Sequence, residues 1–358
     1  MRKCSLHLGT HRTGSTSIQH LLRAKNSALQ ERGYFYPRSG QIPDLPGHHN
    51  LAWEISGDHR FRESAGTIDD LMREINKRSE NIILSSEDFG TALDHQAKFS
   101  EFILLLQSSG FLVRLIVYLR NQVDYVLRSY LALLPSGWNL SWRESIFDLD
   151  HRDMLRRLRE NDEVPQGYIV LHRAGVDLSQ HDSIFDADYC ELLWQVRENP
   201  NVEVVVRCYD RARVSSCADF LSIFDLTLGD LQVNHEVWTN VSPPLREYLL
   251  MFLRNRMGRE LLAREEAVVN RLISSEAKEF QLSPAARMEL SQRFKEANRT
   301  LFIRYGVPEP EMEDASGVRD SHDTPYVDEL FSENIESVLL RSENIPRPRR
   351  MDFQLCDR

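Results

Sequence analysis

Short apolar runs alternate with longer segments of helical spacing along the first two-thirds of the chain. Four apolar runs have the length and composition of buried strands, at residues 3–8, 81–85, 111–119 and 203–209. Apolar residues recur at helical spacing after the first, third and fourth of these runs, over residues 15–32, 123–134 and 214–224. This alternation is typical of βαβ units, so we predict an α/β three-layer sandwich with a central parallel sheet.

The pattern becomes helical after the fourth strand-like run. Helical periodicity covers residues 243–257, 259–274 and 283–305, which predicts a helical C-terminal half. Residues 137–180 carry tryptophans and many charges, and we interpret them as a helical insert in a domain of residues 1–306. Residues 307–358 turn acidic and then basic with prolines, which predicts a C-terminal extension with one short helix near 327–340.

Composition narrows the classes of protein that fit. The chain has 358 residues, of which 41% are hydrophobic, and its formal net charge is −10. A sizeable core is therefore possible, and a general nucleic-acid-binding surface is disfavoured because phosphate backbones attract basic proteins. No apolar window has the length of a membrane span, and residues 1–8 do not resemble a signal peptide.

The five cysteines are scattered along the chain without a close pair. This spacing indicates neither a zinc site nor a disulfide framework, and it fits a reducing, cytoplasmic compartment. Cys4 and Cys208 lie in strand-like runs, so we expect both thiols to be buried as small apolar groups.

A glycine-rich loop between the first strand and the next helix carries the strongest chemical signal. Residues 8–17 read Leu-Gly-Thr-His-Arg-Thr-Gly-Ser-Thr-Ser. Glycines permit a tight turn that gathers backbone N–H groups around an anion, and the helix N-terminus adds partial positive charge. The residues expected to contact phosphate are consecutive: His11, Arg12, Thr13, Gly14, Ser15, Thr16 and Ser17.

This loop differs from that of nucleoside triphosphatases at one position. Gly9 and Gly14 have the spacing of a P-loop, but Ser15 stands where an ATPase or GTPase carries lysine. The cation is instead Arg12, in the middle of the loop. A central cation with hydroxyls at the helix start suits a phosphosulfate.

Arg120, at the end of the third strand-like run, is a second candidate for anion binding. A guanidinium can fork onto a phosphate through two parallel hydrogen bonds. Ser129, two turns into the following helix, would add a hydroxyl donor. Arg128, one position earlier, is the alternative contact, because one step along a helix rotates a side chain by about 100°.

Together these two segments resemble the sulfotransferase family, in the bacterial branch that is similar to carbohydrate sulfotransferases. Residues 7–19 resemble its 5'-phosphosulfate loop, and residues 113–130 resemble its 3'-phosphate element. The resemblance implies a P-loop-containing fold, 3'-phosphoadenylyl sulfate (PAPS) as donor co-substrate and no metal. That branch usually has lysine in place of Arg12, and its serine usually falls at the position of Arg128.

Sulfuryl transfer to oxygen needs a base near the acceptor hydroxyl. Glu87 follows the second strand, at the edge where parallel sheets bind ligands, and the resemblance also favours a glutamate in this role. His49 is the other candidate, because imidazole titrates near neutrality. Arg12 would stabilise negative charge on the departing phosphate.

Two alternatives stay open: a P-loop nucleotide kinase or NTPase, and a catalytically degenerate nucleotide-binding protein. Acceptor-binding loops vary freely on such folds, so glycan, lipid-linked sugar and small metabolite are all candidate acceptors. The sequence does not indicate an oligomeric state.

Overall fold

The computed structural model describes residues 1–43, 45–148, 189–197, 201–209, 215–233, 243–273, 280–305, 326–332 and 335. The chain divides into two compact units. The first unit comprises residues 1–132, 177–242 and 284–319, and the second comprises residues 133–176, 243–283 and 320–358. The domain boundary at residue 306, the insert at 137–180 and the extension at 307–358 stay predictions, and most of the last two lies outside the described residues.

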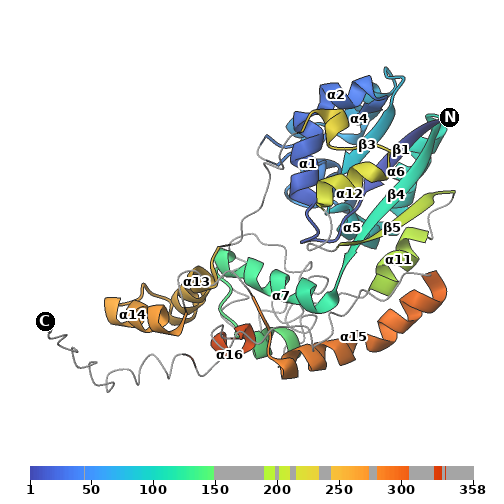
Figure 1. Cartoon of the computed structure of the whole chain (residues 1–358). Coiled ribbons are helices and arrows are strands. Elements are labelled where there is room, and N and C mark those ends of the chain that lie inside the picture. Colours follow the sequence, from blue (N-terminus) through green and yellow to red (C-terminus); the bar gives the residue numbers. More distant parts are fainter. Residues whose placement is uncertain are drawn as a thin grey trace, which may run out of the picture. The chain divides into compact units, whose positions relative to one another are not determined.

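A five-stranded parallel sheet forms the centre of the first unit (Figure 1). Its strands are β1 (Arg2–His7), β2 (Tyr34–Phe35), β3 (Asn81–Ser85), β4 (Phe111–Arg120) and β5 (Glu203–Tyr209). They lie in the order β2-β3-β1-β4-β5, and every neighbouring pair is parallel. The predicted α/β class with a central parallel sheet is confirmed. The chain changes sides of β1 between β3 and β4, which is where such sheets bind ligands at the strand carboxyl ends.

The helices of this unit are α1 (Ser15–Ala24), α2 (Asn26–Glu31), α3 (His49–Ser56), α4 (Ile68–Ile75), α5 (Phe89–Ala92), α6 (Gln96–Ser108), α7 (Gln122–Leu133), α11 (Tyr189–Arg197), α12 (Ser216–Ser222) and α15 (Pro284–Tyr305). The single helix predicted over residues 15–32 is in fact two, because the backbone leaves the helical region at Lys25 (φ −108°, ψ 19°).

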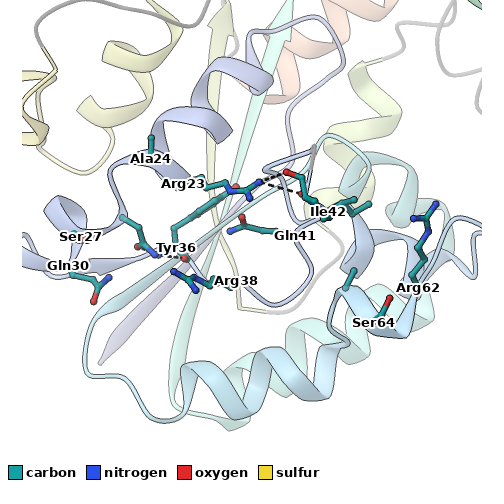
Figure 2. A pocket seen from close by; sticks show the side chains of 13 residues that line it. Arg23, Ala24, Ser27, Gln30, Tyr36, Arg38, Gln41, Ile42, Arg62 and Ser64 are labelled. Atoms are coloured by element: carbon teal, nitrogen blue, oxygen red, sulfur yellow. Dashed lines mark hydrogen bonds between the residues drawn. The ribbon is translucent and has the colours of Figure 1, made fainter.

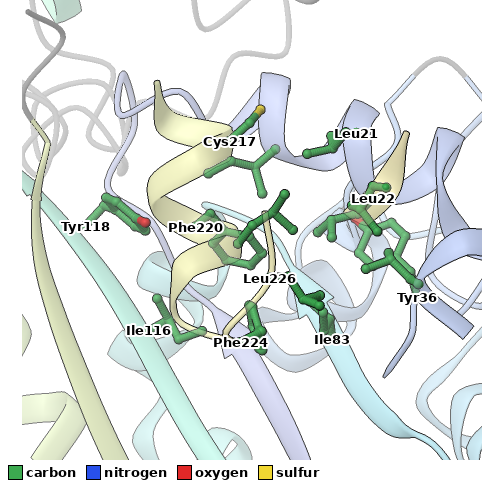
Figure 3. Packing of buried hydrophobic residues seen from close by; sticks show 14 residues of the cluster. Leu21, Leu22, Tyr36, Ile83, Ile116, Tyr118, Cys217, Phe220, Phe224 and Leu226 are labelled. Carbon is green, nitrogen blue, oxygen red and sulfur yellow. The ribbon is translucent and has the colours of Figure 1, made fainter. Parts of the chain in front are cut away.

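Strand alternation sends side chains to both faces of the sheet. On β4, Ile116 and Tyr118 point to the face that α1 and α12 cover, where they join a buried cluster with Leu21, Leu22 and Phe220 (Figure 3). Helix α6 packs against β4 with buried residues that do not belong to this cluster, so it covers the opposite face. Both faces of the sheet are therefore layered with helices.

The two cysteines predicted to be buried differ. Cys4 on β1 is fully buried, because β1 has a neighbouring strand on each side. Cys208 on β5 is exposed, which corrects the prediction. Strand β5 lies at the end of the strand order, so it has a neighbour on one side alone among the described strands.

The second unit is helical in its described part, with α13 (Leu245–Met257), α14 (Ala263–Leu272) and the short α16 (Val327–Leu330). Trp138 is fully buried there, and its indole donates to the Ser145 hydroxyl over 2.9 Å. Asn255 on α13 donates to the carbonyl of Trp138 over 2.9 Å. None of the described helices of either unit combines the length and the apolarity needed to span a bilayer.

Candidate functional site

The glycine-rich loop joins β1 to α1 through three residues with left-handed backbone: Gly9 (φ +50°), Arg12 (φ +67°) and Gly14 (φ +82°). Gly14 is the N-cap of α1. A Cβ atom there would lie 2.6 Å from Ser216 Oγ, so both its backbone conformation and its close packing require glycine. The loop therefore turns directly into the N-terminus of α1, where unpaired N–H groups favour an anion.

Hydrogen bonds fasten the loop to β4. The Thr10 hydroxyl donates to the carbonyl of Tyr118 over 2.9 Å, and the Thr13 hydroxyl donates back to the carbonyl of Thr10 over 2.6 Å. Two residues after Tyr118 on β4, the Arg120 guanidinium donates to the carbonyl of Arg12. The backbone of the loop is thus held in shape by its own protein contacts.

Two buried polar atoms at the base of the loop have no hydrogen-bond partner among the described residues: Ser15 Oγ and His7 Nε2. Both atoms lie next to Gly9, since a Cβ atom added there would be 2.8 Å from Ser15 Oγ and 3.2 Å from His7 Nε2. Buried polar atoms are nearly always paired with protein or water. Thr16 and Ser17, the next hydroxyls of α1, are half-buried.

Arg120 ends β4 and is almost fully buried, with 6% of its surface exposed. Besides the Arg12 carbonyl, its guanidinium pairs with the carboxylate of Asp124, one turn along α7. The central carbon of the guanidinium, Cζ, also lies 5.0 Å from the ring centroid of Tyr209. Asp124 therefore occupies one edge of the guanidinium that the sequence assigns to a phosphate.

The two alternatives on α7 lie in different surroundings. Arg128 Nε is 3.5 Å from Asp124 Oδ1, so Arg120 and Arg128 flank one carboxylate. Ser129 is buried beside the phenol of Tyr125. The structure thus brings Arg128, rather than Ser129, together with the charged groups at the end of β4.

The two candidate bases lie together at the carboxyl end of β3. Glu87 accepts a hydrogen bond of 2.7 Å from the amide of Gln19 on α1. His49, at the start of α3, has its Nδ1 3.1 Å from Asp88 Oδ2. His11, from the glycine loop, is half-exposed, with its Nε2 3.9 Å from the other oxygen of Asp88. The geometry therefore joins residues of the glycine loop, β3 and α3.

The Asp88 carboxylate sets the charge of His49. Burial raises the pKa of Asp88, but its hydrogen bond with His49 and the nearby charges outweigh burial and lower the pKa to about 2. Burial also lowers the pKa of His49, yet Asp88 and Glu87 outweigh it, so the His49 pKa lies above its ordinary value. Ionised Asp88 thus favours the protonated form of the buried His49 imidazole and pairs with it.

The adjacent His48 has a different environment. Its Nδ1 accepts the backbone N–H of Ser85 over 3.1 Å, and its Nε2 lies 3.0 Å from the carbonyl of Pro37, to which it donates. Burial lowers the pKa of His48 to about 4 despite these bonds. His48 is thus a neutral histidine that ties the loop after β2 to β3.

Sequence reasoning missed Gln19, Asp88 and Trp53, which surround the candidate bases, and Asp124, which pairs with Arg120. Two of them carried a signal, because Gln19 lies one turn after Ser15 and Asp124 one turn after Arg120. Asp88 follows Glu87 directly, but the pattern alone does not say which carboxylate is buried. In the part of the chain that the structure describes, no group of three His, Cys, Asp or Glu side chains is arranged to hold a metal ion.

Of the comparisons with known proteins, the one with solved structures gives a match. No protein-family model and no curated protein matches the chain. Among solved structures, it is similar to the crystal structure of a sulfotransferase from Alicyclobacillus acidocaldarius, with 18% sequence identity and a TM-score of 0.36. The alignment covers 73% of this chain and 98% of that one.

Proposed function

We propose that the protein is a sulfotransferase, which transfers the sulfuryl group of PAPS to a hydroxyl or amine. One observation carries the proposal: the glycine loop turns through Gly9, Arg12 and Gly14 into α1 at the same sheet edge as Glu87. An anion cradle and a carboxylate that can take a proton are the two parts that sulfuryl transfer needs. The loop also has the residue pattern that resembles a phosphosulfate loop.

The 5'-phosphosulfate would bind to the backbone N–H groups at residues 11–16 and to the hydroxyls of Ser15, Thr16 and Ser17 at the start of α1. The unpaired, buried Ser15 Oγ supports this placement, because a bound anion would satisfy it. Arg12 is exposed on the loop and carries a permanent charge. It would stabilise the negative charge that develops on the departing 5'-phosphate.

The 3'-phosphate would bind at Arg120, with the Ser129 hydroxyl or the Arg128 guanidinium as the second donor. The hydrogen bond from Arg120 to the carbonyl of Arg12 supports this assignment, because it ties Arg120 to the glycine loop that would hold the 5'-phosphosulfate. Asp124 holds the guanidinium in place through an ion pair. A phosphate would share or displace that contact.

Glu87 would act as the base. It would take the acceptor's proton while the acceptor oxygen or nitrogen forms a bond to sulfur and the S–O bond to the 5'-phosphate breaks, releasing adenosine 3',5'-bisphosphate. The hydrogen bond from Gln19 orients the carboxylate. His49, whose protonated form Asp88 favours, is better placed as a hydrogen-bond donor than as the base.

Transfer of labelled sulfate from PAPS to a panel of sugars, phenols and amines tests the proposal. Glu87→Gln should lower kcat about 100-fold or more, because general-base catalysis contributes at least that much, and should leave donor affinity unchanged. Glu101→Gln, an exposed glutamate on α6, is the matched control. Equal kcat for wild type and Glu87→Gln would reject Glu87 as base, and no transfer to any acceptor would count against the function.

A further inference from the structure

A cavity of about 870 Å³ lies in the first unit, beside the C-terminal half of α1 (Figure 2). Its walls come from α1, α2, the loop after β2 and residues 62–65. This volume falls within the range of about 300–1,000 Å³ that is typical of small-molecule sites.

Three arginines line this cavity: Arg23, Arg38 and Arg62 (Figure 2). All three are exposed, and none of the described residues lining the cavity is acidic. Glu74 lies near the wall, but its carboxylate accepts the backbone N–H groups of Arg38 and Ser39. Like charges gathered around one hollow create a positive potential that favours an anionic ligand.

The remaining lining is largely polar and uncharged. Amide and hydroxyl groups come from Asn26, Ser27, Gln30, Gln41 and Ser64. Such groups hydrogen-bond to hydroxylated ligands, whereas sites for apolar ligands are lined mainly by hydrophobic and aromatic side chains. The lining therefore fits an anion that also carries hydroxyls.

The cavity is connected to the candidate base through α1 and Tyr36. Arg23 lies one turn beyond Gln19 on α1, about 6 Å along the helix axis, and Gln19 holds Glu87. Tyr36 lines the cavity, and its pKa is raised first by burial and then by Glu87, while Arg23 lowers it. The Tyr36 ring is thus within electrostatic reach of both the base and the cavity's arginine.

The walls are held in place by hydrogen bonds. The Arg23 guanidinium donates to the carbonyl of Pro43 over 2.9 Å. The backbone N–H of Gly40 donates to the carbonyl of Ala65 over 2.8 Å, which joins the two loops. The Asn50 amide donates to the carbonyl of Arg62 over 2.9 Å. A preformed cavity binds its ligand at a lower entropic cost.

We propose that this cavity is the acceptor subsite and takes an acidic, hydroxylated acceptor of about disaccharide size, such as an acidic saccharide. A carboxylate, sulfate or phosphate of the acceptor lies on Arg38 and Arg62, and the hydroxyl to be modified points toward Glu87. The inference rests on the proposed function, whose acceptor class it names.

Calorimetry with two probes of similar size tests the subsite: a sulfated uronate–glucosamine disaccharide and the neutral N,N'-diacetylchitobiose. The acidic disaccharide should bind at least about tenfold tighter than the neutral one. Arg38→Gln and Arg62→Gln should each weaken acidic binding about tenfold, since a charge-assisted hydrogen bond contributes that much. Arg299→Gln, an exposed arginine on α15, is the control and should leave binding unchanged. A sugar phosphate is the third probe and shows which anion the arginines prefer.

The Arg38→Gln and Arg62→Gln variants also distinguish a failure of the proposed subsite from a failure of the proposed function. Adenosine 3',5'-bisphosphate should bind equally to wild type, Arg38→Gln and Arg62→Gln, because both arginines lie outside the donor loop. Charge-dependent binding of the acidic disaccharide without sulfate transfer would support the cavity and count against the function. Equal affinity for the two disaccharides, no binding of either, or unchanged affinity in both variants would overturn the subsite, whether or not transfer is observed.

Discussion

His49 Nδ1 lies 3.1 Å from Asp88 Oδ2, and both side chains are more than nine-tenths buried. Asp88 also accepts the indole N–H of Trp53 over 2.8 Å. Burial raises the pKa of this carboxylate, but its hydrogen bond with His49 and the nearby His11 and Arg60 outweigh burial and hold the pKa at about 2.

Asp88→Asn should lower the pKa of His49, because the partner that raises it is removed. In the wild type, the His49 contribution to stability is present below the unfolded pKa and is lost as pH rises through the raised folded pKa. The Asp88 contribution is present above its unfolded pKa and is lost as pH falls toward about 2. NMR titration of the His49 ring in both proteins measures the shift, and an unchanged pKa would contradict the ion pair.

Gly14→Ala should destabilise the protein and weaken donor binding, because the new Cβ meets Ser216 and the φ of +82° is unfavourable for alanine. Gly110→Ala is the matched control, with φ +86° and no atom within 4 Å of the added Cβ. The control should lose about 1–2 kcal/mol from left-handed strain alone, and Gly14→Ala should lose more. Equal losses in urea unfolding, with donor affinity intact, would show that the loop tolerates a side chain.

Asp124→Asn should tighten the binding of adenosine 3',5'-bisphosphate about three- to tenfold. The change removes a negative charge that occupies the Arg120 guanidinium and flanks Arg128. The gain should shrink with rising salt, since exposed charges are screened. Weaker binding in this variant would instead mean that Asp124 is needed to orient Arg120 for the phosphate.

The free energy of unfolding should fall as pH drops from about 6.5 toward 4, because His7 and His48 are buried and neutral. Burial lowers the pKa of each to about 4, so the unfolded chain binds more protons in this range and acidification favours it. The raised pKa of His49 makes that residue stabilise the folded protein on acidification. His7 and His48 together should outweigh this single contribution. Urea unfolding at several pH values measures the slope, and a flat profile between pH 6.5 and 5 would contradict the two buried neutral histidines.

The strands of the sheet were predictable because each has a strong local signal. Residues 81–85 and 203–209 were predicted with the bounds that β3 and β5 have, since continuous apolar runs between polar turns allow few other readings. The short β2 was missed, because two residues carry no periodicity and the prolines that follow them indicate a loop. Its pairing with β3 is a tertiary contact that the local sequence does not contain.

The candidate site was predictable where chain order implies position. Loops that follow neighbouring parallel strands meet at one sheet edge, which is why Glu87 and the glycine loop lie together. The partners on other elements were not predictable, since the Gln19–Glu87 bond and the Asp88–Trp53 bond join segments far apart in sequence. The three-arginine cavity was missed for the same reason: Arg23, Arg38 and Arg62 show no spacing that indicates a shared hollow.

Calorimetric titration with adenosine 3',5'-bisphosphate, compared with ATP and magnesium, tests the central claim most directly. The account predicts one bisphosphate site, at least about tenfold tighter than ATP, which Arg120→Ala weakens about tenfold or more through loss of a charge-assisted phosphate contact. Tighter binding of ATP with magnesium, or bisphosphate binding that Arg120→Ala leaves unchanged, would contradict it.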